Sequence, residues 1–141
     1  MRESTRGGVY LMQFFLPMNP PTATPQMKQV TVTKRGRPRF YEPPAVADAR
    51  AKLTAHLAPH RPETPFQGPV RLVCKWCWAS SKHQSGTYKA TKPDTDNLQK
   101  LLKDVMTTLQ FWHDDAQVAS EIIEKFWSDT PGIWVSVEPL E

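Results

Sequence analysis

Two pairs of aspartates could bind a metal ion if the fold brings them together. Asp94 and Asp96 lie one residue apart in "KPDTDNLQK", and Asp114 and Asp115 are adjacent in "FWHDDAQV". Carboxylates gathered at one place repel each other unless a cation neutralises them. Their hard oxygen ligands suit Mg²⁺, and Mn²⁺ can substitute. The chemistry that such a site predicts is metal-assisted hydrolysis of a phosphodiester bond.

Lys100 follows Asp96 by four residues, which is one helical turn, so both can lie on one helix face. Its ammonium group could orient the attacking water or stabilise charge that develops on a phosphate. The competing interpretation is structural, because aspartate is favoured at a helix N-cap and in the first turn. One aspartate is fully explained that way, whereas two acids and a second pair exceed what a cap needs.

The aspartate pairs flank a predicted helix over residues 96–110. Its apolar stripe consists of Leu98, Leu101, Leu102, Val105 and Leu109. The helix would be about 20 Å long at 1.5 Å per residue. The pairs can therefore meet only if the following strand begins near the start of the helix, and the sequence leaves this open.

The rest of the chain predicts one α+β domain over residues 1–141, with a mixed β-sheet flanked by two main helices. Alternating or continuous apolar residues predict strands over 9–16, 29–33, 70–79 and 132–140, and a further strand at the end of 114–127. A second helix is expected over 45–57, with Pro44 in its first turn. Residues 1–8 are polar and predict a loose start. The strand over 70–79 is too apolar on both faces for an exposed edge.

The charge distribution fits a protein that binds phosphates around a metal site, and an ordinary surface with uneven charge would show the same pattern. The formal net charge is +4, yet half of the 14 acidic residues fall within 94–124. Basic residues concentrate in a predicted hairpin and in the loop before Asp94. The candidate DNA contacts are Lys34, Arg35, Arg37, Arg39, Lys89 and Lys92. For the hairpin, an ordinary solvated loop is an almost equally good interpretation.

Several features exclude other classes of protein. No apolar run is long enough to cross a membrane, and the stretch 9–18 lacks the cleavage site of a signal peptide, which predicts a cytoplasmic protein. Cys74 and Cys77 would point to opposite faces of a strand, so we expect buried free thiols rather than a zinc or redox site. Trp112 lies beside the second acidic pair and is a candidate for a structural role there.

The order Asp-x-Asp-Asn-Leu-x-Lys, a helix, and then Phe-Trp-x-Asp-Asp-x-Gln-Val resembles the RusA family of Holliday-junction-resolving endonucleases of phages and prophage-bearing bacteria. The likeness is strong over 92–125, and "LPMNPP" (16–21) is similar to the Pro-rich loop of the family. The sequence departs from the family pattern at "TATPQMK" and in a longer loop over 80–93. Both departures concern DNA contacts rather than the acids.

The resemblance implies a small, homodimeric, Mg²⁺-dependent enzyme that nicks two opposing strands of a four-way DNA junction. Carried over by position, Asp94, Asp96 and Asp115 match the catalytic, metal-binding carboxylates of the family, and Lys100 matches its essential lysine. Asp114 matches a neighbouring acid beside them. A dimer suits the two-fold symmetry of a junction.

The sequence thus predicts a Holliday-junction endonuclease that acts on branched DNA in the cytoplasm of a bacterial host. Two alternatives remain open. One is a metal-dependent nuclease with a broader substrate range that includes flaps and other branched DNA. The other is a non-catalytic DNA-binding protein whose aspartates merely cap a helix.

Overall fold

The computed structural model of the chain describes residues 2–6, 9–25, 29–32 and 38–141. Five strands form the main sheet in the order β1-β2-β7-β5-β6. Their bounds are β1 Arg2–Arg6, β2 Val9–Pro17, β5 Val70–Trp78, β6 Val118–Trp127 and β7 Gly132–Pro139. A separate hairpin pairs β3 (Gln29–Val32) with β4 (Pro38–Tyr41). Neighbouring strands are antiparallel except β5 and β6, which are parallel, so the sheet is mixed as predicted.

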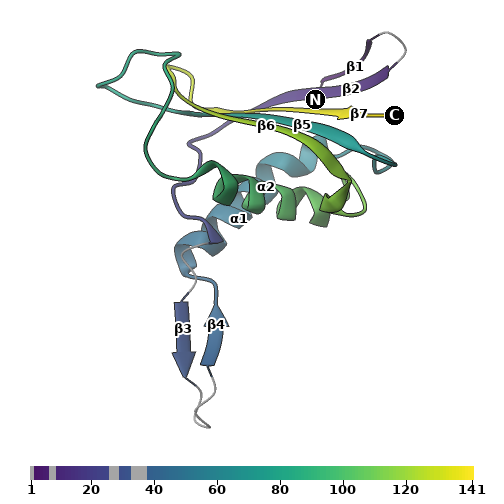
Figure 1. Cartoon of the computed structure of the whole chain (residues 1–141). Helices are drawn as coiled ribbons and strands as arrows, with labels where there is room; N and C mark the ends of the chain where they lie inside the picture. The colour runs from purple at the N-terminus through teal and green to yellow at the C-terminus, as the bar shows by residue number, and fades with distance from the viewer. Residues whose placement is uncertain (1, 7–8, 26–28, 33–37) are drawn as a thin grey trace.

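Two helices, α1 (Pro44–Leu57) and α2 (Thr95–Thr108), cover one face of this sheet (Figure 1). The predicted α+β class with two main helices is confirmed. Short 3₁₀ turns, η2 (Ala58–His60) and η3 (Asp115–Gln117), follow the helices in the chain. The predicted apolar stripe forms most of the buried side of α2, with Met106 in addition. Burial of this stripe against the sheet removes apolar surface from water, which is the main force that holds the layers together.

Strand β5 lies inside the sheet, between β7 and β6, so it is not an exposed edge, as its apolar sequence predicts. Its residues alternate strictly between buried and half-buried, and Trp76 and Trp78 share the buried side. Their ring centroids lie 6.3 Å apart. Both thiols are free as expected, and Cys74 is buried. The expected burial is wrong for Cys77, which faces the opposite side of the strand and is half-buried. Burial raises the pKa of the Cys74 thiol, so this sulfur is an inert core atom.

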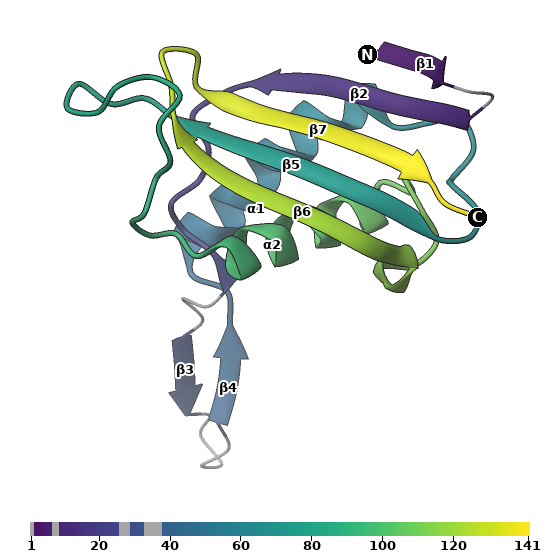
Figure 2. The same ribbon diagram turned by 45° about the horizontal axis from the view of Figure 1, so that its top comes forward.

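The β5-α2-β6 unit determines where the aspartates lie. Because β5 and β6 are parallel, the connecting helix runs back along the sheet, opposite to both strands. The end of β6 therefore returns to the start of α2, where Lys125 Nζ donates to Pro93 O at 2.7 Å. The start of β6 lies at the far end of the helix (Figure 2).

The prediction of a loose start over 1–8 is wrong for residues 2–6, which pair with β2 as β1. A short polar strand has no alternation of apolar and polar residues that would predict it. Its backbone is ordered by pairing with β2. Lys34, Arg35 and Arg37, which the sequence analysis places in a basic hairpin, lie outside the described residues. Among the described helices, none is long and apolar enough to cross a membrane.

Candidate active site

The first acidic pair stands at the start of α2. Asp94 is the N-cap residue, with extended backbone angles of φ −72° and ψ 146°, yet its side chain makes no capping hydrogen bond. Asp96 lies in the first turn, and both residues are exposed. The Asp94 carboxylate therefore does not cap the helix, and its oxygens are available to bind another group. Asp96 can still interact favourably with the helix dipole.

The orientation of α2 keeps Asp96 and Lys100 at the surface. Between them in the chain, Gln99 is buried and accepts a hydrogen bond from Trp76 Nε1 at 2.9 Å. Gln99 Nε2 donates in turn to Glu121 Oε2 at 2.9 Å, and Lys103 forms an ion pair with Glu121 at 3.3 Å. These contacts fix the rotation of the helix about its axis. Lys100, one turn after Asp96, is exposed on its outer side.

The second acidic pair lies in the turn after α2, and its two members differ. Asp114 caps η3: its Oδ1 accepts from Ala116 N at 2.9 Å, while Gln117 Oε1 accepts from Asp114 N at 3.1 Å. Gln117 Nε2 also donates to Phe66 O and Gly68 O, which ties this turn to a distant segment. Asp114 thus has a structural function. Asp115 is exposed beside it.

The two pairs do not meet within one chain. They are separated by α2, whose 14 residues span about 21 Å. No group of three His, Cys, Asp or Glu side chains in the described ranges could hold a metal ion. The return strand needed to begin near the start of α2, and instead it ends there, because β6 runs parallel to β5. The metal-binding and catalytic roles of Asp94, Asp96, Asp115 and Lys100 stay predictions.

The donor chemistry of the first pair nevertheless fits a divalent cation. Asp94 and Asp96 are both exposed, and neither carboxylate has a hydrogen-bonded or ionic partner within the described parts of the chain. Such oxygens are the ligands that Mg²⁺ and Mn²⁺ prefer. Two carboxylates from one chain form an incomplete site, so further ligands must come from elsewhere.

Trp112 has the structural role that its position suggested. It is fully buried, and its Nε1 donates to Thr107 Oγ1 at 2.7 Å. The neighbouring Phe66 pairs with it in an isolated bridge. Trp112 therefore holds the turn that contains Asp115 against the end of α2.

The predicted DNA contacts have different surroundings. Lys89 is buried, with its Nζ 5.3 Å from the ring centroid of Trp78 and 4.3 Å from that of Trp127. This gives Lys89 a packing function, and a DNA contact by it stays a prediction. Lys92 is exposed, and Arg39 lies in β4.

Lys125 belongs near the candidate site although no sequence pattern marks it. Its Nζ donates to the carbonyl oxygens of Thr91 and Pro93, immediately before Asp94. A single lysine in a strand resembles any surface lysine in the sequence. Only the pairing of β6 alongside β5 brings it to the start of α2.

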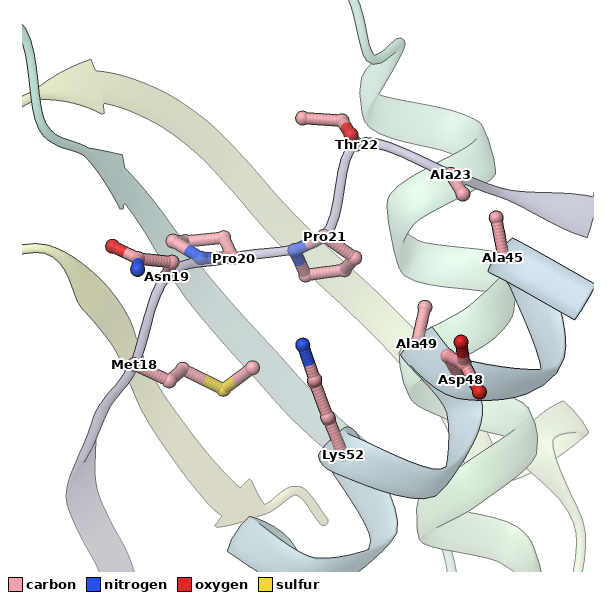
Figure 3. A pocket seen from close by; sticks show the side chains of 10 residues that line it. All are labelled: Met18, Asn19, Pro20, Pro21, Thr22, Ala23, Ala45, Asp48, Ala49 and Lys52. Carbon is pink, nitrogen blue, oxygen red and sulfur yellow. The ribbon is translucent and has the colours of Figure 1, made fainter.

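A pocket of about 330 Å³ lies between the Pro-rich segment and α1 (Figure 3). Asn19, Pro20 and Pro21 line one side, and Asp48 and Lys52 of α1 line the other. None of the predicted catalytic residues contributes to it. Asp94, Asp96, Asp114 and Asp115 therefore do not line this pocket.

Comparison with known proteins decides the family. The sequence model of the endodeoxyribonuclease RusA family matches residues 17–138, a range that includes both acidic pairs and Lys100. The chain belongs to the RusA family. Crossover junction endodeoxyribonuclease rusA of Lactococcus phage r1t is 32% identical over 98 residues, which cover 67% of this chain and 72% of that protein.

A second relative of this RusA-family chain is uncharacterized protein YqaN of Bacillus subtilis strain 168. It is 34% identical over 93 residues, which cover 57% of this chain and 65% of YqaN. The chain thus spans about two thirds of the length of these curated relatives.

Proposed function

We propose that this protein is a structure-selective endodeoxyribonuclease that resolves four-way DNA junctions by hydrolysing phosphodiester bonds. Membership of the RusA family and the similarity to the phage r1t protein support this function. The structural observation that carries the proposal is the exposed Asp94 carboxylate, which stands at a helix N-cap without capping the helix. Residues 1–141 would form one RusA-like endonuclease domain.

In this proposal, Asp94 and Asp96 hold Mg²⁺ or Mn²⁺ at the start of α2, and Asp115 completes the set. A cation bound there would neutralise charge on the scissile phosphate and activate a water molecule. The ammonium group of Lys100 stabilises the negative charge that develops on the phosphate. Asp114 keeps the turn folded so that Asp115 is presented correctly.

A second copy of the chain can supply the missing Asp115. Strand β6 lies at the edge of the sheet (Figure 2). The outer side of its last residues is paired with the preceding loop, through Lys89 N to Lys125 O and Trp127 N to Thr87 O. In the described chain, the backbone of residues 118–124 has no hydrogen-bonded neighbour on that side. Ile122 is 49% exposed there.

Such an unpaired edge with an exposed apolar side chain favours pairing with another strand. If two β6 edges pair antiparallel about a two-fold axis, the start of each strand lies beside the end of the other. The partner's Asp115, three residues before its β6, then approaches the end of β6 where Lys125 contacts Pro93. Each site would combine Asp94 and Asp96 with the partner's Asp115.

A homodimer with two such sites matches the two-fold symmetry of a junction, which needs two equivalent cuts. The basic residues Lys34, Arg35, Arg37 and Arg39, together with Lys92, would contact DNA phosphates. Branched DNA is thus the proposed substrate, in the cytoplasm of a bacterial host.

The decisive experiment is a strand-cleavage gel with an end-labelled synthetic four-way junction. Wild type and Asp94→Asn are compared with Mg²⁺ and with EDTA, and a flap and a plain duplex serve as competing substrates. We expect paired, symmetric nicks in the junction only with wild type and Mg²⁺. Equal cutting of flaps would support the broader nuclease instead. Binding without nicks under any condition would leave a DNA-binding protein and refute the proposal.

A further inference from the structure

Lys125 holds the chain segment that leads directly into the candidate site. From the helix side of β6, its Nζ donates to Thr91 O at 2.6 Å and to Pro93 O at 2.7 Å. Its backbone carbonyl accepts from Lys89 N at 2.9 Å. One residue thus contacts three points of residues 89–93, and Asp94 is the next residue in the chain.

A second lysine reinforces this arrangement from the other side. The Lys89 ammonium lies between Trp78 and Trp127, and it donates to Thr91 Oγ1. Burial, together with the nearby positive charge of Lys125, lowers the pKa of Lys89. Thr91 is therefore bound twice, by Lys125 at its carbonyl and by Lys89 at its hydroxyl.

We propose that Lys125 is a positioning residue for the Asp94–Asp96 pair. Peptide groups are planar, so the hydrogen bond to Pro93 O fixes the orientation of the peptide plane that ends at the Asp94 nitrogen. That plane sets the direction in which the Asp94 side chain leaves the backbone, and hence its relation to Asp96 on the first helical turn. The inference rests on the proposed function, because it assigns Lys125 to the same metal-binding acids.

This contact matters more for geometry than for the stability of the fold. Thr91 is exposed, so water can replace the ammonium group at its carbonyl, whereas Pro93 is buried and its carbonyl would lose its donor. The core of α2 is formed by Leu98, Leu101 and Leu102, which lie further along the helix. Loss of the Lys125 ammonium should therefore leave the protein folded and loosen only the entry to α2. Groups that orient metal ligands typically contribute about 10- to 100-fold to metal affinity or activity.

The test uses Lys125→Met, which keeps an unbranched side chain one atom shorter than lysine and removes the ammonium donors. Lys75→Met is the matched control, because Lys75 lies on the adjacent strand and its Nζ packs over Trp134 at 5.2 Å from the ring centroid. Lys125→Arg restores a cationic donor. For each protein, Mn²⁺ binding is measured without DNA by electron paramagnetic resonance. Amide hydrogen exchange over residues 92–99 is measured in the metal-free protein, and thermal melting reports on folding.

We expect Lys125→Met to weaken Mn²⁺ binding about 10-fold and to speed exchange over 92–99, with a melting temperature close to that of wild type. Lys125→Arg should recover part of the Mn²⁺ affinity and part of the protection from exchange. Lys75→Met should change neither the Mn²⁺ affinity nor the exchange rate. Should Lys125→Met fail to fold, Lys125→Gln carries the same measurements.

Wild-type Mn²⁺ affinity and wild-type exchange in the folded variant would overturn the positioning role, even if cleavage were lost. If wild type itself neither binds Mn²⁺ nor nicks a junction, the proposed function falls, and the inference with it. If wild type nicks junctions while Lys125→Met binds Mn²⁺ normally, only the inference falls.

Discussion

The two ends of α2 carry the same kind of side chain in different settings. At the start, Asp94 and Asp96 are exposed, and Asp94 makes no capping hydrogen bond. Beyond the end, Asp114 is engaged in a capping box with Gln117, and Asp115 stands free of it. The comparison distinguishes Asp114, whose side chain stabilises a turn, from the exposed aspartates that make no such hydrogen bond. Three such acids are the expected number for the proposed site, and they lie at two ends of one helix.

The largest effect should come from the start of the helix. Asp94→Asn should lower the rate of junction cleavage about 1,000-fold, because a bound cation contributes several kcal/mol of charge stabilisation and each 1.36 kcal/mol is a factor of ten. The melting temperature should stay near that of wild type, since no capping bond is lost. Single-turnover cleavage and thermal melting check both. A rate within a few-fold of wild type would remove Asp94 from the site.

Mixing two inactive variants tests whether the two ends belong to one site. Asp94→Asn and Asp115→Asn are each expected to be inactive. If every site uses Asp94 from one chain and Asp115 from the other, heterodimers contain one intact site and one with both substitutions. Exchange of subunits should then restore nicking of one strand. If the mixture stays inactive although subunits exchange, the composite site is wrong.

The proposed β6 edge can be broken without touching an acidic residue. Ile122→Asp would bring two like charges together across the two-fold axis, and such pairs are destabilising. We expect a monomer in sedimentation velocity and loss of cleavage. Ala55→Asp, on the exposed side of α1, adds the same charge elsewhere and should leave the dimer intact. A dimeric, active Ile122→Asp protein would place the interface on another surface.

At the far end of α2, the two neighbouring aspartates should respond in opposite ways. Asp114→Ala removes a cap and should lower the free energy of unfolding by about 0.5–2 kcal/mol. Asp115→Asn should leave that free energy unchanged and abolish cleavage. Urea denaturation and cleavage assays on both proteins distinguish the roles. Equal loss of stability in both would show that Asp115 is structural too.

The smallest effect concerns pH. The pKa of Lys89 is lowered in the folded protein, so near and below its usual value of 10.5 the unfolded chain binds more protons than the folded one. Stability from this group therefore rises with pH through that window. The difference in melting temperature between wild type and Lys89→Met should shift in favour of wild type as pH rises towards 10.5. A difference that does not depend on pH would contradict the burial of a charged Lys89.

Much of the fold follows from local patterns in the sequence. The stripe from Leu98 to Val105 defines α2, and the continuous apolar run of β5 predicts a strand away from the sheet edge, because both patterns reflect burial of side chains. The strand β1 is not predicted, since its polar residues gain order only by pairing with β2. The β-strand propensity of residues 2–6 does not indicate which strand they pair with.

The candidate site is only half predictable. Residue types and spacing select Asp94, Asp96 and Lys100, which share one helix, so their proximity follows from helical geometry alone. The position of Asp115 depends on the direction of β6, which the sequence does not specify. Lys89 looks like a phosphate contact in a basic loop, and its burial between Trp78 and Trp127 depends on tertiary packing. The same is true of Lys125.

The attachment of the loop to β6 also bears on how its length can vary. Residues 81–85 are exposed, and backbone hydrogen bonds from Gly86 to Trp127 and from Lys89 to Lys125 lie between them and Asp94. A change in length at the tip would be absorbed before it reaches these bonds. Insertions and deletions should therefore accumulate at 81–85 among homologues, and a peptide tag or fluorophore inserted there should report on the protein without disturbing its acidic residues.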